Sequence, residues 1–144
     1  MTLARNRSMP DFAVLPVLNY RDVRAAVAWL GRAFGARERL RIGEHRAQLL
    51  IGEGAFIVAA FHGMGLGAPD APRHSIMVRV DNVDAHLARA AEFGARILAK
   101  ATDFPYGERQ YTAEDAGGHV WTFSQTIADV DPATWGAKLI SAPE

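Results

Sequence analysis

The chain has 144 residues, of which 49% are hydrophobic and 22% are charged, a composition typical of one globular domain with a sizeable core. Its 16 basic and 16 acidic residues balance, and the arginines are scattered, so neither a nucleic acid nor a membrane is an expected partner. There is no cysteine, which excludes disulfides and thiolate chemistry. Because no signal-peptide core and no run of about 18 apolar residues is present, we expect a single cytoplasmic domain over residues 1–144.

The first elements predicted along the chain are a strand and an amphipathic helix. The strand ends near Tyr20, and apolar residues then recur at helical spacing from Val23 to Phe34. Asp22 can accept hydrogen bonds from the free amides of the first helical turn, and Gly35 suits the left-handed residue after the helix. Three short strands separated by glycine-containing turns follow, over residues 36–43, 46–52 and 55–61.

The same order of elements is predicted a second time. The tetrapeptide Phe-Gly-Ala-Arg ends the helical pattern at 34–37 and recurs at 93–96, where it follows a helix capped by Asp81 or Asn82. A repeat at this spacing indicates duplication of one βαβββ unit. The second copy contains strands over residues 74–80, 96–100, 108–114 and 119–125. The predicted organisation is a first module (about 12–61), a Gly/Pro-rich linker (62–73), a second module (about 74–126) and a C-terminal tail (127–144).

Two stretches resemble the vicinal oxygen chelate superfamily, the glyoxalase/bleomycin resistance/dioxygenase family. The segment YGERQYTAEDAGGHVWTFSQ (106–125) is similar to the closing hairpin of that family, and AVAWLGRAFGA (26–36) is similar to its first helix. The resemblance covers about residues 12–126. It implies an α+β fold in which two tandem βαβββ modules form a curled, mostly antiparallel sheet with a concave groove. Because this scaffold serves both metal enzymes and metal-free binders, the fold alone does not decide the function.

Metal-using members of the superfamily carry one metal ligand on each of four strands that face the groove. Matched to that pattern, the four positions in this chain are Leu15, Val58, Ser75 and Thr122. A catalytic metal site needs about three imidazole or carboxylate donors, which these positions do not supply. The resemblance therefore predicts no metal and no other cofactor.

His74 opens the predicted strand 74–80 next to one of these positions. Successive strand side chains alternate between faces, and His74 shares the parity of Ile76 and Val78, which we expect to face the helix. A bulge between residues 74 and 76 would instead bring His74 into the groove as a ligand. The remaining histidines are expected to be solvated or locally hydrogen-bonded: His45, His62, His86 and His119.

The same alternation predicts which side chains face the groove. Met77 and Arg79 should face it, whereas Trp121 and Phe123 should pack beneath the second helix. Glu108 is the one nearby carboxylate considered for general-base chemistry, and no catalytic residue is assigned. The predicted ligand-binding residues are Asn19, Met77, Arg79, Phe104, Tyr106, Arg109, Tyr111 and Thr122.

Two parts of that set depend on conditions that the sequence leaves open. Phe104 and Tyr106 lie in a predicted loop, where they either cover a ligand or form a small satellite core. Arg109 and Tyr111 belong to the site only if their side chains point inward.

A mostly apolar groove with few polar groups is typical of a binding pocket. The sequence favours a metal-free protein of the bleomycin-resistance kind that sequesters a small planar or apolar molecule, neutral or anionic because Arg79 faces the groove. The alternative is a metal-dependent lyase, isomerase or dioxygenase of the glyoxalase superfamily. Apolar residues in the tail also predict a homodimer.

Overall fold

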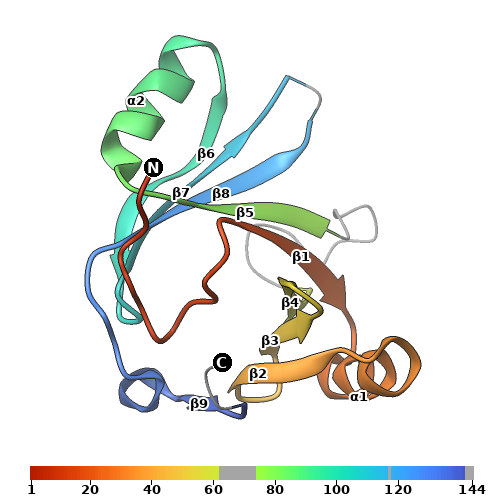
Figure 1. The fold of residues 1–144 in the computed structure, drawn as a ribbon. Coiled ribbons are helices and arrows are strands. Elements are labelled where there is room, and N and C mark those ends of the chain that lie inside the picture. Colours follow the sequence, from red (N-terminus) through yellow and green to blue (C-terminus); the bar gives the residue numbers. More distant parts are fainter. Residues whose placement is uncertain (62–73, 117, 142–144) are drawn as a thin grey trace. The chain divides into compact units, whose positions relative to one another are not determined.

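The computed structural model describes residues 1–61, 74–116 and 118–141, so the predicted linker 62–73 lies outside the described residues. The chain divides into two compact units (Figure 1). The first unit comprises Pro16–His74 together with Pro132–Glu144, and the second comprises Met1–Leu15 together with Ser75–Asp131. Each repeat of the sequence therefore forms the body of one unit, and a terminal segment of the chain completes it.

The first unit contains a sheet with strand order β1-β4-β3-β2-β9 and one helix. Its β1 and β4 run parallel, while the other neighbours run antiparallel. Strand β9 was not predicted from the sequence, and it extends the sheet by pairing with β2. The elements are β1 (Val14–Tyr20), α1 (Val23–Phe34), β2 (Arg37–Ile42), β3 (Arg46–Ile51), β4 (Gly54–Ala60), the 3-10 helix η1 (Pro132–Trp135) and β9 (Ala137–Leu139).

The second unit repeats this plan, with strand order β6-β7-β8-β5 and β5 parallel to β8. Its elements are β5 (His74–Val80), α2 (Val83–Glu92), β6 (Arg96–Phe104), β7 (Glu108–Glu114) and β8 (Val120–Thr126). The α+β class and the two tandem, mostly antiparallel βαβββ modules are thus confirmed. Strand β6 is longer than predicted, so Phe104 ends a strand instead of lying in a loop.

The two helices begin where the sequence predicts. Asp22 accepts a hydrogen bond from the Ala25 amide at 2.9 Å, and Asn82 accepts one from the Ala85 amide at 3.0 Å. Each cap satisfies an amide that has no partner within its helix. Gly35 follows α1 with φ 75°, the left-handed conformation that glycine adopts at low cost.

Each helix covers one face of its own sheet. Helix α1 contacts β2, β3 and β4, and helix α2 contacts β6, β7 and β8 (Figure 1). The buried residues beneath α1 are Val23, Leu30, Ala47, Leu49 and Val58. Those beneath α2 are Val80, Val83, Tyr111 and Ala113. None of the helices among the described residues is both long and apolar enough to cross a membrane.

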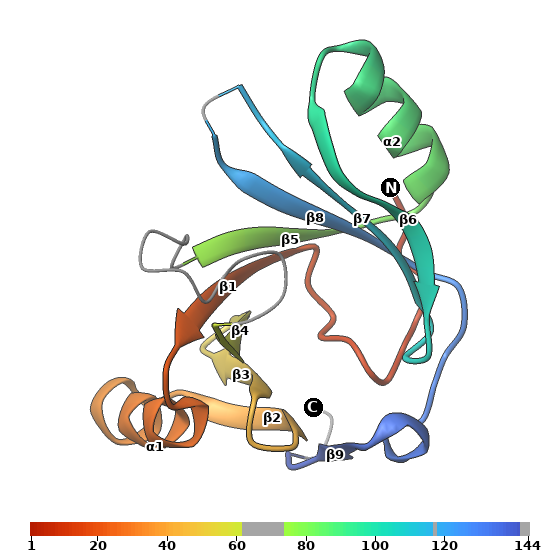
Figure 2. The ribbon, with the colours of Figure 1, turned by 180° about the vertical axis from the view of Figure 1, so that it is seen from behind.

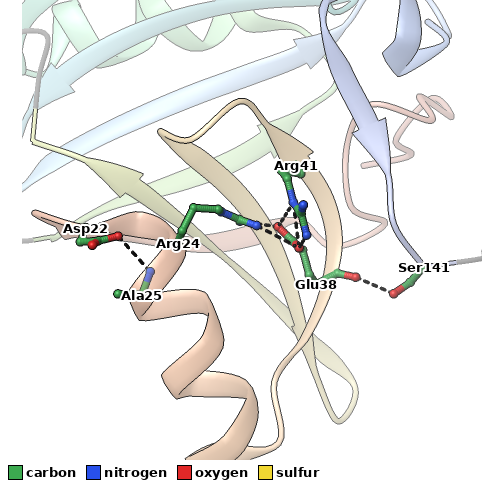
Figure 3. A network of polar contacts seen from close by, with 6 residues as sticks. All are labelled: Asp22, Arg24, Ala25, Glu38, Arg41 and Ser141. Carbon is green, nitrogen blue, oxygen red and sulfur yellow. Dashed lines mark hydrogen bonds and ion pairs between the residues drawn. The ribbon is translucent and has the colours of Figure 1, made fainter.

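In the first unit Glu38 joins the helix and the sheet through its carboxylate, and the C-terminal segment through its backbone oxygen (Figure 3). Glu38 on β2 bonds the guanidinium groups of Arg24 and Arg41, and its backbone oxygen accepts from the Ser141 hydroxyl. Burial alone would raise the pKa of Glu38, but the hydrogen bonds from Arg41 and Arg24 outweigh it and hold the pKa below its ordinary value. Glu38 therefore remains charged and binds three segments of the unit together.

A turn in the second unit requires glycine at position 107. Gly107 has φ 81°, and a methyl group added there would clash with the Ala128 carbonyl oxygen and lie 2.7 Å from Val130 Cγ2. We predict that Gly107→Ala lowers the free energy of unfolding by more than about 3 kcal/mol, because strain and steric overlap add. The free energy is measured by urea denaturation.

The matched control is Gly94→Ala. Gly94 has φ 91° but nothing lies within 4 Å of the added methyl group, so only the backbone strain of about 1–2 kcal/mol is expected. Equal losses in the two variants would mean that the segment 128–130 does not pack against the turn as described.

Candidate functional site

The face of the second unit's sheet that α2 does not cover is lined mainly by polar side chains. We call this surface the polar face. Paired residues share a face, so the ladders between β5, β8 and β7 place Met77 beside Thr122, Arg79 beside Ser124, and Gln110 opposite Ser124. The polar face comprises Met77, Arg79, Glu108, Gln110, Thr112, Thr122, Ser124 and Thr126.

Glu108 lies at the centre of a hydrogen-bond network on the polar face and has no exposed surface. Its Oε1 accepts from Ser124 Oγ at 2.6 Å, and its Oε2 accepts from Thr126 Oγ1 at 2.6 Å and from Asn6 Nδ2 at 2.8 Å. Three donors compensate the loss of water around this carboxylate. Because those donors already occupy both oxygens, Glu108 acts in the fold as an acceptor.

Arg79 supplies the opposite charge and is 2% exposed. Its Nη1 donates to the Pro10 oxygen at 2.7 Å, and its Nη2 donates to the Ala4 oxygen and to Thr126 Oγ1, both at 2.9 Å. Thr126 Oγ1 thus accepts from Arg79 and donates to Glu108, so one hydroxyl bridges the two buried charges. Within the described part of the chain, Arg79 Nε is a buried donor with no hydrogen-bond partner.

The N-terminal segment, residues 4–10, lies along one end of the polar face. Figure 2 shows its trace running near the β6–β7 turn. Asn6 is 1% exposed and its amide donates to both the Tyr106 oxygen and Glu108, while Asn6 Oδ1 accepts from the amides of Ser8 and Val130. Each hydrogen-bonding position of this buried amide is therefore filled. The segment is held by these hydrogen bonds, and its apolar residues Met9 and Pro10 are also buried.

The polar face brings together part of the residue set predicted from the sequence. Met77, Arg79 and Thr122 lie on it, and Thr122 Oγ1 bonds Thr112 Oγ1 at 3.1 Å. Phe104 pairs with Glu108 at the end of β6 and stacks on Tyr106, with ring centroids 5.4 Å apart. The Tyr106 hydroxyl donates to Gln110 Oε1 at 3.0 Å.

The other predicted residues lie elsewhere. Asn19 belongs to the first unit, where it is 7% exposed on β1. Arg109 and Tyr111 have the opposite parity to Glu108 and Gln110, so they face α2 and not the polar face. Arg109 forms ion pairs with Asp84 on α2 and with Asp103. Tyr111 is 1% exposed in the core beneath α2.

Trp121 and Phe123 face α2, as their parity predicted, with Phe123 packed against the core beneath it. Gln110 and Thr112 were not predicted to lie on the polar face, because the sequence leaves the orientation of β7 open. The orientation of β7 could have been predicted from Tyr111 and Ala113, because alternate apolar residues of a strand face the helix.

The four positions at which metal-using relatives carry ligands do not fit a metal in this chain. Leu15 and Val58 are apolar and fully buried, and Thr122 bonds Thr112. The register predicted for β4 was wrong. Val58 packs under α1 with Val23 and Leu30 instead of facing the groove. No group of three His, Cys, Asp or Glu side chains suited to a metal ion occurs among residues 1–61, 74–116 and 118–141.

His86 was expected to be solvated or locally hydrogen-bonded, but its hydrogen-bond partner, Tyr111, lies 25 positions away along the chain. His86 is half-buried on α2, its ring lies 4.0 Å from the Phe123 ring, and its Nδ1 lies 2.6 Å from the Tyr111 hydroxyl. Burial, with a smaller effect of the Arg89 charge, lowers the pKa of His86. Burial also raises the pKa of Tyr111, so the hydroxyl keeps its proton at neutral pH.

The lowered pKa of His86 predicts a pH dependence of stability. Below the ordinary histidine value of about 6.5 the unfolded chain binds a proton that the folded chain binds less well, so stability falls as the pH falls through this window. We predict that His86→Gln makes the decline between about pH 6.5 and 5 shallower, as measured by urea denaturation at several pH values. His119→Gln, which removes an exposed histidine, is the control; an unchanged slope in His86→Gln would contradict the assignment.

The fold and the site together define a duplicated βαβββ protein of the glyoxalase type. Residues 13–123 match the family model of the Glyoxalase/Bleomycin resistance protein/Dioxygenase superfamily. The chain belongs to this superfamily. A comparison with curated protein sequences gave no match.

Solved structures show the same fold at low sequence identity. Methylmalonyl-CoA epimerase from Mycobacterium tuberculosis is 16% identical, with a TM-score of 0.65, over 90% of this chain and 98% of that one. A variant of the Streptomyces coelicolor methylmalonyl-CoA epimerase is 20% identical, with a TM-score of 0.63, over 81% and 98%. TioX from Micromonospora sp. ML1 is 34% identical over 76% and 94%, but it superposes poorly, with a TM-score of 0.35.

Proposed function

We propose that this protein binds a small, largely planar organic molecule on the polar face without a metal ion, in the manner of a sequestering or resistance protein. The ligand is neutral or anionic and offers a hydrogen-bond acceptor to Arg79. The observation that carries this proposal is the unpaired Nε of Arg79, a buried donor that lacks an acceptor among the described residues.

The contacts of Arg79 indicate which chemistry the polar face recognises. The N-terminal segment approaches Arg79 through two backbone carbonyl oxygens, those of Ala4 and Pro10, so the guanidinium already binds neutral acceptors. When the N-terminal segment that covers Arg79 moves aside, a carbonyl or carboxylate of a ligand would extend this pattern to the remaining N–H group. The hydroxyls of Thr112 and Thr122 and the side chain of Met77 provide polar and apolar contacts for the rest of the molecule.

The donor set supports metal-free binding. The four family ligand positions offer no imidazole or carboxylate; they are Leu15, Val58, Ser75 and Thr122. The carboxylate on the polar face, that of Glu108, already accepts three hydrogen bonds. A metal-dependent lyase, isomerase or dioxygenase would require other donors. We also expect a homodimer and a cytoplasmic location, as the sequence predicts.

The proposal is tested by calorimetric titration with 2-naphthoate, a flat anion that carries an acceptor. We predict saturable binding that Arg79→Lys weakens at least about tenfold, because lysine keeps the charge but lacks the planar set of donors. Arg96→Lys, an exposed site on β6, is the control and leaves binding unchanged. The melting temperature of each variant shows whether a loss of binding reflects unfolding.

A second arm tests the metal-dependent alternative. An ion that binds only the native state, present at a concentration 100 times its Kd, would add about 2.7 kcal/mol to the free energy of unfolding and raise the melting temperature by several degrees. We expect no such rise with Zn²⁺, Ni²⁺, Mn²⁺ or Fe²⁺. A rise that His74→Ala abolishes, or tight binding of (aminomethyl)naphthalene that is insensitive to Arg79→Lys, would refute the proposal.

A further inference from the structure

The second unit has a cavity of about 250 Å³ on the side of β7 and β8 that faces α2, opposite to the polar face. Three alanines in its wall, one each from α2, the α2–β6 turn and β7, are too short to fill it. The rest of its lining is three aromatic rings and two acidic residues, Glu114 and Asp115. The apolar and aromatic part of the lining is His86, Ala90, Ala95, Ala113, Trp121 and Phe123.

The aromatic residues beneath α2 form a flat surface. Trp121 and Phe123 are alternate residues of β8 with rings inclined by 3°, and Phe123 lies opposite Tyr111 on β7 with rings inclined by 25°. The indole Nε1 of Trp121 donates to Asp115 Oδ2 at 3.0 Å, which fixes the plane of that ring. A planar ring stacked on this surface would bury apolar area without reorganising the site.

His86 adds one directional group to the cavity. The Tyr111 hydroxyl is buried and keeps its proton, so it needs an acceptor, and the acceptor within reach is His86 Nδ1 at 2.6 Å. That hydrogen bond selects the imidazole tautomer with the proton on Nε2. His86 therefore offers the cavity an N–H donor.

The charges of the lining select against anions. Glu114 and Asp115 are the acidic residues of the cavity, and both oxygens of Asp115 already accept hydrogen bonds, from the His119 amide and from Trp121. A carboxylate on the ligand would be repelled by these groups. The volume is below the usual range for drug-sized ligands, about 300–1,000 Å³, so it suits one or two fused rings.

We infer that this cavity is a second small-molecule site, which takes a neutral planar aromatic molecule of one or two fused rings that offers a hydrogen-bond acceptor to His86. The aromatic surface of Trp121 and Phe123 provides the stacking contact. The site is independent of the polar face, because it lies on the other side of the same two strands.

The test uses three probes of nearly equal shape: quinoline, which has a ring acceptor, naphthalene, which has none, and 2-naphthoate, which is anionic. Binding is followed by the NMR resonance of the Trp121 indole N–H, assigned with Trp121→Phe. We expect quinoline to shift this resonance saturably, naphthalene to bind several-fold more weakly, and 2-naphthoate to leave it unchanged at concentrations that saturate the polar face.

A pair of variants on α2 tests the place of binding. Ala90→Leu fills the cavity and is expected to weaken quinoline binding at least tenfold, whereas Ala88→Leu, the same change at an exposed position, leaves it intact. If Ala90→Leu does not fold, His86→Phe is used instead, because it keeps a ring but removes the N–H donor, and it is expected to lower the affinity for quinoline to that for naphthalene. In Arg79→Lys, quinoline is expected to shift the Trp121 resonance as in the unaltered protein. This variant weakens binding on the polar face, so the two sites can be tested separately.

Two results would overturn the inference. One is the absence of any saturable shift of the Trp121 resonance with quinoline. The other is a shift of the same size and midpoint in Ala90→Leu as in the unaltered protein, because quinoline would then bind outside the cavity.

Discussion

The second unit depends on two opposite charges buried on one side of its sheet and linked by a single hydroxyl. Arg79 on β5 and Glu108 on β7 both bond Thr126 on β8, so the bridge connects three strands. Removing two such charges from water is costly, and the cost is offset only if their remaining donors and acceptors find partners. The N-terminal segment supplies them: the amide of Asn6 reaches Glu108, and two backbone oxygens reach Arg79. The segment is therefore part of the second unit, although the first repeat follows it in the sequence.

This arrangement gives the two faces of β7 and β8 different chemistry. One face carries charges, hydroxyls and amides that are linked to each other, and one donor of Arg79 is left over. The other face carries stacked rings and a histidine that is hydrogen-bonded to a buried tyrosine. Strand alternation alone creates this division, because neighbouring residues such as Gln110 and Tyr111 point to opposite sides. The polar face and the face beneath α2 therefore offer different contacts, although they belong to the same strands.

The sequence predicted the parts of the fold that follow from apolar periodicity. The helices, the cap at Asp22, and the orientation of β5 and β8 were predicted correctly, and of the two cap candidates for α2, Asp81 and Asn82, the structure has Asn82. The register of β4 was wrong at Val58, because both faces of that strand are apolar and alternation then gives no signal.

The site was harder to predict from the sequence than the fold. The N-terminal segment buries Asn6 and Ser8 through hydrogen bonds, and such burial leaves no periodic pattern. The partner of His86 was not predicted for a related reason, since Tyr111 is 25 positions away along the chain. Partners that distant become visible only when the sheet is assembled.

The claim that the two buried charges support one another is tested most directly by a double-mutant cycle. The free energy of unfolding is measured by urea denaturation for the unaltered protein, Arg79→Met, Glu108→Gln and the double variant. Each single change leaves the other charge buried without its partner. Each single variant is therefore expected to lose more than half of the free energy of unfolding that the double variant loses. We expect the double variant to lose at least about 1 kcal/mol less than the sum of the single losses, whereas additivity within about 0.5 kcal/mol would show that the two charges do not stabilise one another.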